Sequence, residues 1–298
     1  MEKMTNRNIS LHIDTLGDDM RQSITAAAQL GYSGIAVGIG HPQLSASDFG
    51  TTARRQWVKM LQAHQLELTA IRAGAGVRGC VDPVNAEVLI HQARRAFELA
   101  RECCAGAVVV YLGEPSQPPS KSSATPSALH RQGHAVADSD SRQASMIDAV
   151  LDELLSAADR IGITLVVSSG DPAWLKEIIR GHCSKTVGAA LDTYRILAAG
   201  FSPEDAACQL AGMIKLWICA DAVRGGGVTQ NVQLGTGQAH LQATVKILEE
   251  QYFSGATIVD IRGLAEPLAA ARHAAQKLAE LFAARQPASA PRVVANQL

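Results

Sequence analysis

Short runs of alternating apolar and polar residues recur along this chain, and stretches with helical spacing separate them. In the first run, residues 9–14, isoleucine or leucine occupies every second position, which is the period-two pattern of a strand with one apolar face. In residues 34–39 only glycine and alanine alternate with the large apolar side chains, and residues that small suit a crowded interior. Further strands are predicted at 66–72, 107–112, 163–168, 187–192, 214–220 and 256–261.

The stretches between these runs predict helices. Residues 146–161 place apolar side chains at every third or fourth position, which gives a helix one apolar stripe. Eight strands alternating with about eight helices, in 298 residues, predict an α/β fold with a single closed (β/α)8 or TIM barrel. An open doubly wound sheet is the alternative, and the lack of a GxGxxG motif after the first strand disfavours it.

One long stretch, residues 114–145, breaks the pattern because it is rich in serine, proline and alanine and poor in large apolar residues. We expect a loop insertion here, either a mobile lid over a site or a disordered segment. The predicted barrel then spans residues 1–283, and residues 284–298 are expected to form a flexible tail.

Charge and composition narrow the classes of partner. The net charge is −1 and no block of like charges occurs, so we expect no nucleic acid as a partner. No run reaches the roughly 18 to 20 apolar residues of a membrane helix, and the first ten residues lack a secretory apolar core, so we expect no membrane partner. The six cysteines have no framework spacing, which favours reduced thiols and a cytoplasmic location.

Polar residues near the carboxyl ends of the strands form the site in such a barrel. The alternation places His12, Asp192 and Asp260 inward, and Arg195 follows directly after the strand that ends at Asp192. The facing of Arg72 and of Asp221 stays open at this stage.

Each of these residues also has a purely structural interpretation. Asp192 can cap the helix after it, and His12 can be an ordinary interior histidine. Arginines near the strand ends can serve only to neutralise buried acids, because unpaired interior charges are costly. The glycine-rich stretches VRGGG at 223–227 and LGTG at 234–237 can be plain turns, and as phosphate-binding loops they lack the lysine and hydroxyl of a P-loop.

Several motifs, in the right order over nearly the whole chain, resemble those of the xylose isomerase-like TIM barrels, the superfamily of sugar isomerases and epimerases that includes endonuclease IV. They are GYSGIAV from Gly31, LELTAIR, ITLVVSS, VGAALDTYR, KLWICAD, VQLGTG and VDIRG. The resemblance implies an isomerase or epimerase fold and, as in many such proteins, a dimer or tetramer.

The resemblance also implies a divalent Mn or Mg ion, held by Glu, Asp, His and Glu on strands five to eight. In this chain the corresponding positions hold Ser168, Asp192, Ile218 and Asp260. The usual DxxH motif has become Asp192-Thr193-Tyr194-Arg195, the usual GEG is Gly235-Thr236-Gly237, and the glutamate of the second strand is Ala36. Because hard cations need several oxygen or nitrogen ligands, we predict that the metal is lost and that Arg195 replaces its charge by pairing with Asp192 and Asp260.

The functional hypothesis is an isomerase or epimerase acting on a small sugar, sugar phosphate or polyol, either independent of metal or impaired. The alternative is an inactive barrel that binds a carbohydrate-like or anionic small molecule, and an endonuclease is a third, weaker reading because it needs more metal ligands. The predicted catalytic residues are Asp192, Arg195 and Asp260, and the predicted substrate-binding residues are His12, Arg72, Ser168, Asp221, Arg224 and Arg262.

Overall fold

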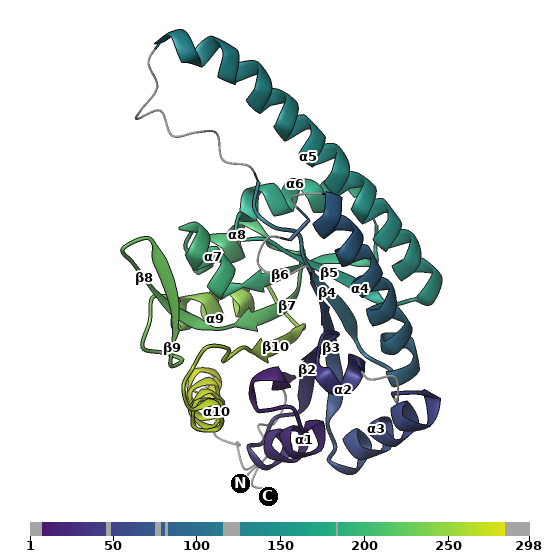
Figure 1. Ribbon diagram of the computed structural model, residues 1–298. Helices are drawn as coiled ribbons and strands as arrows, with labels where there is room; N and C mark the ends of the chain where they lie inside the picture. Colours follow the sequence, from purple (N-terminus) through teal and green to yellow (C-terminus); the bar gives the residue numbers. More distant parts are fainter. Residues whose placement is uncertain are drawn as a thin grey trace, which may run out of the picture.

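Eight parallel strands form a closed barrel in the computed structural model, which describes residues 8–45, 49–74, 79–80, 83–115, 126–182 and 184–283. Around the barrel the order is β1-β10-β7-β6-β5-β4-β3-β2, so the first and last barrel strands lie side by side (Figure 1). The predicted α/β barrel is therefore confirmed. The strands are β1 (Ile9–His12), β2 (Gly34–Gly38), β3 (Glu67–Ala73), β4 (Ala107–Tyr111), β5 (Thr164–Ser168), β6 (Val187–Asp192), β7 (Ile214–Cys219) and β10 (Ala256–Val259).

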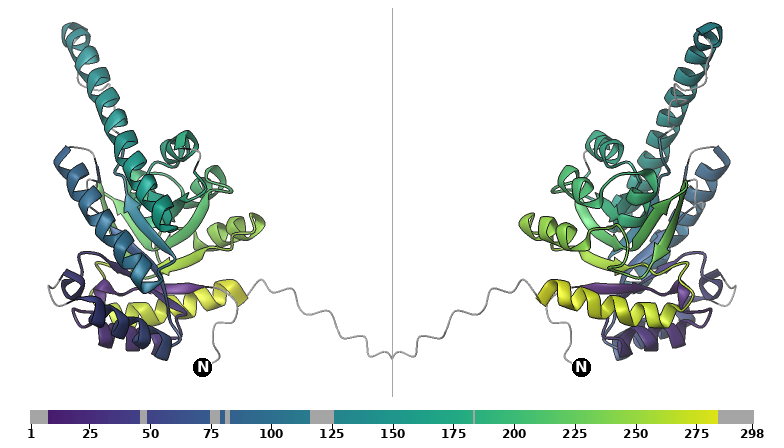
Figure 2. Two further views of the ribbon diagram at one scale, coloured as in Figure 1. Left: turned by 90° about the vertical axis from the view of Figure 1, so that its right-hand side faces the viewer. Right: turned by 90° about the vertical axis from the view of Figure 1, so that its left-hand side faces the viewer.

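Helices surround the barrel on the outside, and α10 packs beneath β1 and β10 (Figure 2). None of the helices within the described residues has the length and apolar character needed to cross a membrane. The helices are the 3-10 turn η1 (Ile13–Thr15), then α1 (Met20–Gln29), α2 (Pro42–Ser45), α3 (Thr51–Ala63), α4 (Pro83–Cys103), α5 (Pro126–Ile161), α6 (Pro172–His182), α7 (Thr193–Ala199), α8 (Pro203–Gln209), α9 (Leu241–Glu250) and α10 (Pro267–Ala283).

Two separate apolar layers reflect the alternation in the strands. The outer layer, between strands and helices, contains Ile9 and Leu11 as predicted, and both are almost completely buried. The inner layer fills the barrel and is built largely from small or β-branched side chains, because eight strands leave little room at the axis. Its members are Ala36, Ala70, Ala107, Val109, Val166, Ala190, Leu216, Ile218, Ala256 and Ile258.

Helix α5 departs from the prediction. It begins at Pro126, twenty residues before the expected start at Met146, so 126–145 are helical and not part of a loop. Once the amphipathic segment has formed a helix, each further residue adds one hydrogen bond at little cost, which favours extension towards Pro126. Figures 1 and 2 show this first part of α5 extending away from the barrel. Residues 116–125 of the predicted insertion and the predicted tail 284–298 lie outside the described residues.

A two-stranded antiparallel hairpin follows β7 where only a glycine-rich loop was expected. Its strands are β8 (Asp221–Gly225) and β9 (Val228–Val232). Gly226 and Gly227 both have positive φ, 59° and 80°, as a tight two-residue hairpin turn requires. The Tyr194 hydroxyl of α7 donates to the Thr229 carbonyl at 3.2 Å, and the Asn231 amide donates to the Arg262 carbonyl at 2.5 Å. The hairpin therefore joins α7 to the segment after β10.

Candidate active site at the carboxyl ends of the strands

Five charged side chains gather where the barrel strands end, and we call them the mouth cluster: Arg72, Asp192, Arg195, Asp260 and Arg262. Arg72 comes from β3 and lies between the two acids. Its Nη1 is 2.7 Å from Oδ2 of Asp260, and its Nη2 is 4.0 Å from Oδ2 of Asp192. The sequence predicted that Arg195 pairs with both aspartates. In the structure Arg72 does so instead.

Asp260 is held from two sides. Arg262 donates from Nε to both carboxylate oxygens, at 2.8 and 3.0 Å, and its backbone amide donates to Oδ1 at 3.2 Å. Burial by itself raises the pKa of Asp260, but the charges of Arg72 and Arg262 outweigh burial and hold this pKa well below the usual range for an aspartate. Asp260 is consequently ionised across the whole physiological range.

Asp192 lies in a different environment, although it faces the same space. Its Oδ1 accepts from the backbone amide of Arg195 at 3.1 Å, so Asp192 caps the start of α7, as the structural interpretation predicted. Burial raises the pKa of Asp192, and the charges of Arg72 and Arg195 offset this only in part. The mouth cluster therefore contains two buried carboxyl groups whose pKa values are shifted in opposite directions.

Arg195 stacks on an aromatic ring. Its guanidinium carbon lies 4.0 Å from the centroid of Tyr111, the last residue of β4. The Tyr111 hydroxyl donates to Oε1 of Glu114 at 2.8 Å, and Glu114 in turn accepts from the backbone amide of Gly170 at 2.8 Å. Sequence reasoning missed Tyr111 and Glu114, although the inward alternation of residues 107, 109 and 111 in β4 would have identified Tyr111.

His12 is buried beside the mouth cluster, at the end of β1, with 2% of its surface exposed. Burial, followed by the charge of Arg72, lowers its pKa to about 4, against opposing contributions from Asp14 and Asp260. His12 is therefore a neutral imidazole near pH 7. Its Nε2 lies 3.7 Å from Oδ2 of Asp14, and its buried Nδ1 has no hydrogen-bond partner within the described part of the chain.

Three predicted substrate-binding residues occupy other settings. Ser168 is buried at the end of β5 beside Tyr111, and its hydroxyl reaches the Val110 carbonyl at 3.5 Å. Asp221 lies two residues after Cys219, which belongs to the outer layer, so Asp221 is on the helix side of the sheet and not inside the barrel. Its carboxylate accepts from four backbone amides at 2.8 to 3.0 Å, those of Ala222, Gly235, Gly237 and Ala239. Arg224 is on the hairpin, with its guanidinium against Gly200 at the end of α7.

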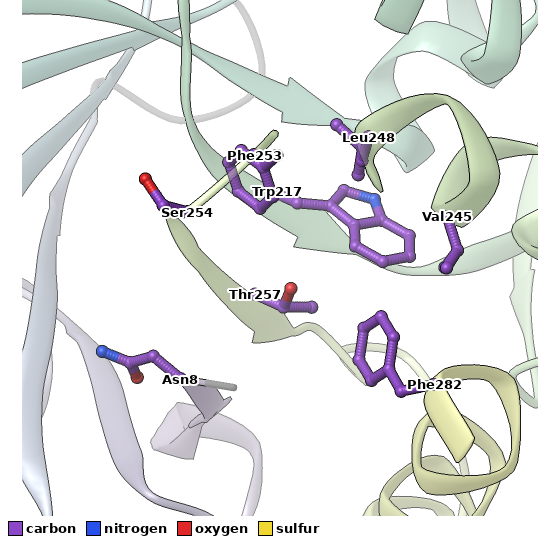
Figure 3. Close-up of a pocket in the computed structure, with 9 residues that line it drawn as sticks. Asn8, Trp217, Val245, Leu248, Phe253, Ser254, Thr257 and Phe282 are labelled. Atoms are coloured by element: carbon purple, nitrogen blue, oxygen red, sulfur yellow. The ribbon is translucent and has the colours of Figure 1, made fainter. Parts of the chain in front are cut away.

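A separate cavity of about 320 Å³ lies at the opposite end of the barrel, between α9 and α10. Figure 3 shows Trp217 of β7 and Phe282 of α10 facing each other across it. The cavity also contacts Asn8 and Gly255, which precede β1 and β10. No titratable side chain lines it within the described residues, so the chemistry of the mouth cluster has no counterpart there.

Comparison with solved structures shows the same fold in proteins of low sequence identity. A xylose isomerase domain protein from Planctomyces limnophilus is 18% identical, with 93% of this chain and 96% of that chain covered and a TM-score of 0.70. A xylose isomerase-like TIM barrel protein from Mycobacterium smegmatis, in complex with magnesium, is 15% identical over 95% and 99% of the chains, with a TM-score of 0.69. A D-tagatose 3-epimerase-like protein is 14% identical over 93% and 97%, with a TM-score of 0.71. A search of curated proteins finds no match to the sequence.

The side chains of this barrel do not fit a divalent ion of the kind bound in the magnesium complex. Within the described residues, no three His, Cys, Asp or Glu side chains come close enough together to hold a metal ion. Of the four positions that the resemblance assigns, Ile218 is apolar and buried in the inner layer, the Ser168 hydroxyl is directed to a carbonyl, and Asp260 already pairs with two arginines. An incoming cation would have to compete with the guanidinium groups for a single acidic pair.

The family follows from the sequence as a whole. The family model of the xylose isomerase-like TIM barrel matches residues 24–281, which include every barrel strand except β1. The matched range also includes all five residues of the mouth cluster. This chain therefore belongs to the xylose isomerase-like TIM barrel family.

Proposed function

We propose that the barrel binds a small polyhydroxylated carbonyl compound at the mouth cluster and catalyses an isomerase-type proton shift without a divalent cation. The observation that carries the proposal is the position of Arg72 between Asp192 and Asp260. A guanidinium is permanently charged and presents several fixed donors, so it can stabilise the oxyanion that forms when a proton leaves the carbon beside a carbonyl. In this role Arg72 replaces the Lewis acid that a metal would supply.

Asp192 is the residue that we assign to proton transfer. Its raised pKa makes it a better base than an ordinary aspartate, whereas the depressed pKa of Asp260 makes that carboxylate a poor one. Asp192 would remove the proton from the hydroxyl-bearing carbon beside the carbonyl, leaving an enediolate whose oxygens contact Arg72. Once the hydroxyl proton has moved to the former carbonyl oxygen, the protonated Asp192 would return its proton to the former carbonyl carbon. Because one carboxyl group can serve both carbons on the same face, the arrangement favours isomerisation over epimerisation, which delivers the proton to the opposite face.

The second candidate function is ligand binding without turnover. It is favoured by the extent to which the mouth cluster is already paired, because both oxygens of Asp260 contact guanidinium groups and one oxygen of Asp192 caps α7. Such a barrel would bind a carbohydrate-like or anionic molecule in the same place.

Deuterium exchange separates the two candidates. The purified protein, treated with a chelator, is incubated in D2O with a panel of aldoses, ketoses, their phosphates and sugar acids that carry a carbonyl group, and deuterium at the carbon beside the carbonyl is followed by NMR. We expect incorporation with at least one compound, unchanged by the chelator, and a loss of about a hundredfold or more in Asp192→Asn. Asp205→Asn, at an exposed position in α8, is the matched control and should leave the rate unchanged.

Two results would reject the isomerase. Exchange that disappears with the chelator and returns with Mn²⁺ or Mg²⁺ would show that the metal is retained. Binding of panel compounds with no exchange in any of them would leave the inactive barrel as the function.

A further inference from the structure

Arg195 differs from the other two arginines of the mouth cluster, because it has no acidic partner among the residues that the structure describes. Arg72 and Arg262 both pair with Asp260 at hydrogen-bonding distance. Within the described part of the chain, no carboxylate oxygen lies within 4.0 Å of the Arg195 guanidinium, and no hydrogen bond from its side chain is formed. The side chain is nevertheless partly buried. Its nitrogens are not among the buried side-chain atoms that lack a partner in the described part of the chain, so water reaches them and a ligand can take the place of that water.

The stacked position leaves those donors available. The contact with the Tyr111 ring, 4.0 Å from the guanidinium carbon to the ring centroid, engages the charge of Arg195 but uses none of its N–H groups as a hydrogen-bond donor to another side chain. An arginine with free N–H groups can bind two oxygens of one carboxylate side by side. Asp192, the nearest acid along the chain, accepts from the backbone amide of Arg195 as a helix cap and makes no ion pair with its guanidinium within the described residues.

The surroundings hold Arg195 in place. Its backbone amide donates to Asp192, and its carbonyl packs so closely on Gly170 that a Cβ added there would lie 2.6 Å from the carbonyl oxygen. Beneath the guanidinium, the Tyr111 ring is anchored through its hydroxyl to Glu114, which also accepts from Gly170. A binding group that is already ordered loses little entropy when the ligand arrives.

We propose that Arg195, stacked on Tyr111, binds a carboxylate of the ligand, so that the ligand of this barrel is a sugar acid or related polyhydroxy acid and not a neutral sugar. A single guanidinium with unpaired donors matches one negative charge, whereas a phosphate dianion would call for a second free cation or a set of backbone amides. The inference uses the same site as the proposed function and names the substrate class for it.

Calorimetric binding with matched probes tests the inference without requiring turnover. Threonate, ribonate and gluconate are each compared with the polyol of the same chain length, and glucitol 6-phosphate is compared with glucitol. We expect at least one acid to bind about tenfold to a hundredfold more tightly than its polyol, because a charge-assisted bidentate pair has that worth. Arg195→Gln should abolish this preference, because it weakens binding of the acid far more than binding of the polyol.

Two further variants keep the test interpretable if Arg195→Gln folds poorly. Tyr111→Leu removes the ring platform but keeps the charge and should reduce the preference for the acid, whereas Tyr111→Phe keeps the ring and should retain most of it. Arg94→Gln, a charge removal at a 64% exposed surface pair with Glu153, is the matched control and should bind like the wild type. Circular dichroism spectra identify variants that are folded.

The outcomes divide clearly. The inference is overturned if no acid is preferred, if the preference persists in Arg195→Gln, or if the phosphate is preferred to the acid. Acid binding through Arg195 without deuterium exchange in any sugar or sugar acid would reject the proposed isomerase and leave this inference standing. Deuterium exchange confined to neutral sugars would reject this inference and leave the proposed isomerase standing.

Discussion

Two buried aspartates at the carboxyl ends of neighbouring strands are neutralised in different ways. Asp221 follows β7 on the helix side of the sheet and accepts from four backbone amides. Asp260 follows β10 on the inner side and pairs with the side chains of Arg72 and Arg262. A carboxylate that accepts from several backbone amides fixes the conformation of one loop and has no role left in ligand binding. A carboxylate that pairs with arginines leaves further guanidinium N–H groups that a ligand can bind.

The largest effect should come from removing the backbone-held acid. Asp221→Ala leaves four backbone amides, two of them in buried and two in part-buried hydrogen bonds, without their acceptor, and we expect the free energy of unfolding to fall by about 3 to 5 kcal/mol in urea denaturation. Ligand binding by the fraction that remains folded should change little. Asp18→Ala, at an exposed position, is the control and should stay within about 0.5 kcal/mol of the wild type. A small loss in Asp221→Ala would mean that water replaces the carboxylate, and the comparison would fail.

A smaller effect on stability is expected for Asp260→Asn. We expect a cost of about 2 kcal/mol at pH 7, towards the low end for a buried pair because the Arg262 side chain is 44% exposed and partly screened by water. Since the pKa of Asp260 is lower in the folded state, its contribution is fully present above the unfolded-state pKa of about 4 and is lost as the pH falls below it. The stability difference between wild type and variant should therefore narrow in urea denaturation at pH 3. A difference that stays constant with pH would contradict the pairing.

The smallest effect is expected for Asp192→Asn, and it should increase the free energy of unfolding instead of lowering it. Because the pKa of Asp192 is higher in the folded state, its contribution to stability is present below the unfolded-state pKa and is lost as the pH rises through the folded-state value. Asn can still cap α7, so Asp192→Asn should be more stable than the wild type by up to about 1 kcal/mol at pH 7, with no difference near pH 3. Urea denaturation at both pH values measures this. Destabilisation at pH 7 would show that Asp192 is a fully paired ion like Asp260.

The fold could be predicted from the sequence because alternation in the strands is a local signal. Ala36, Ala190 and Ile258, which the alternation of β2, β6 and β10 turns inward, lie in the inner layer. The same alternation placed Asp192 and Asp260 together at the end of the barrel, where Arg72 contacts both. Strand parity was sufficient for these residues because a closed barrel brings all inward positions of one level to a common axis.

Partner choice within the site could not be predicted in the same way. Arg72 and Arg195 both point to the mouth cluster, and which of them bridges the aspartates depends on the Tyr111 ring that holds Arg195 aside. The β8–β9 hairpin was taken for a loop because its strands are short and polar, and its turn of two glycines was the available signal. The length of α5 was underestimated because residues 126–145 are poor in large apolar residues, so the sequence shows no apolar stripe there.

The hairpin also has a practical consequence, because β9 is hydrogen-bonded to two segments of the site. Through Tyr194 and Arg262 it joins the segment that carries Arg195 to the segment that carries Asp260. A ligand that shifts either segment would change these hairpin contacts, and the tip of the hairpin is exposed to solvent. A fluorescent dye attached at Val228, which is 68% exposed, would therefore serve as an optical reporter of occupancy without touching the residues that hold the ligand.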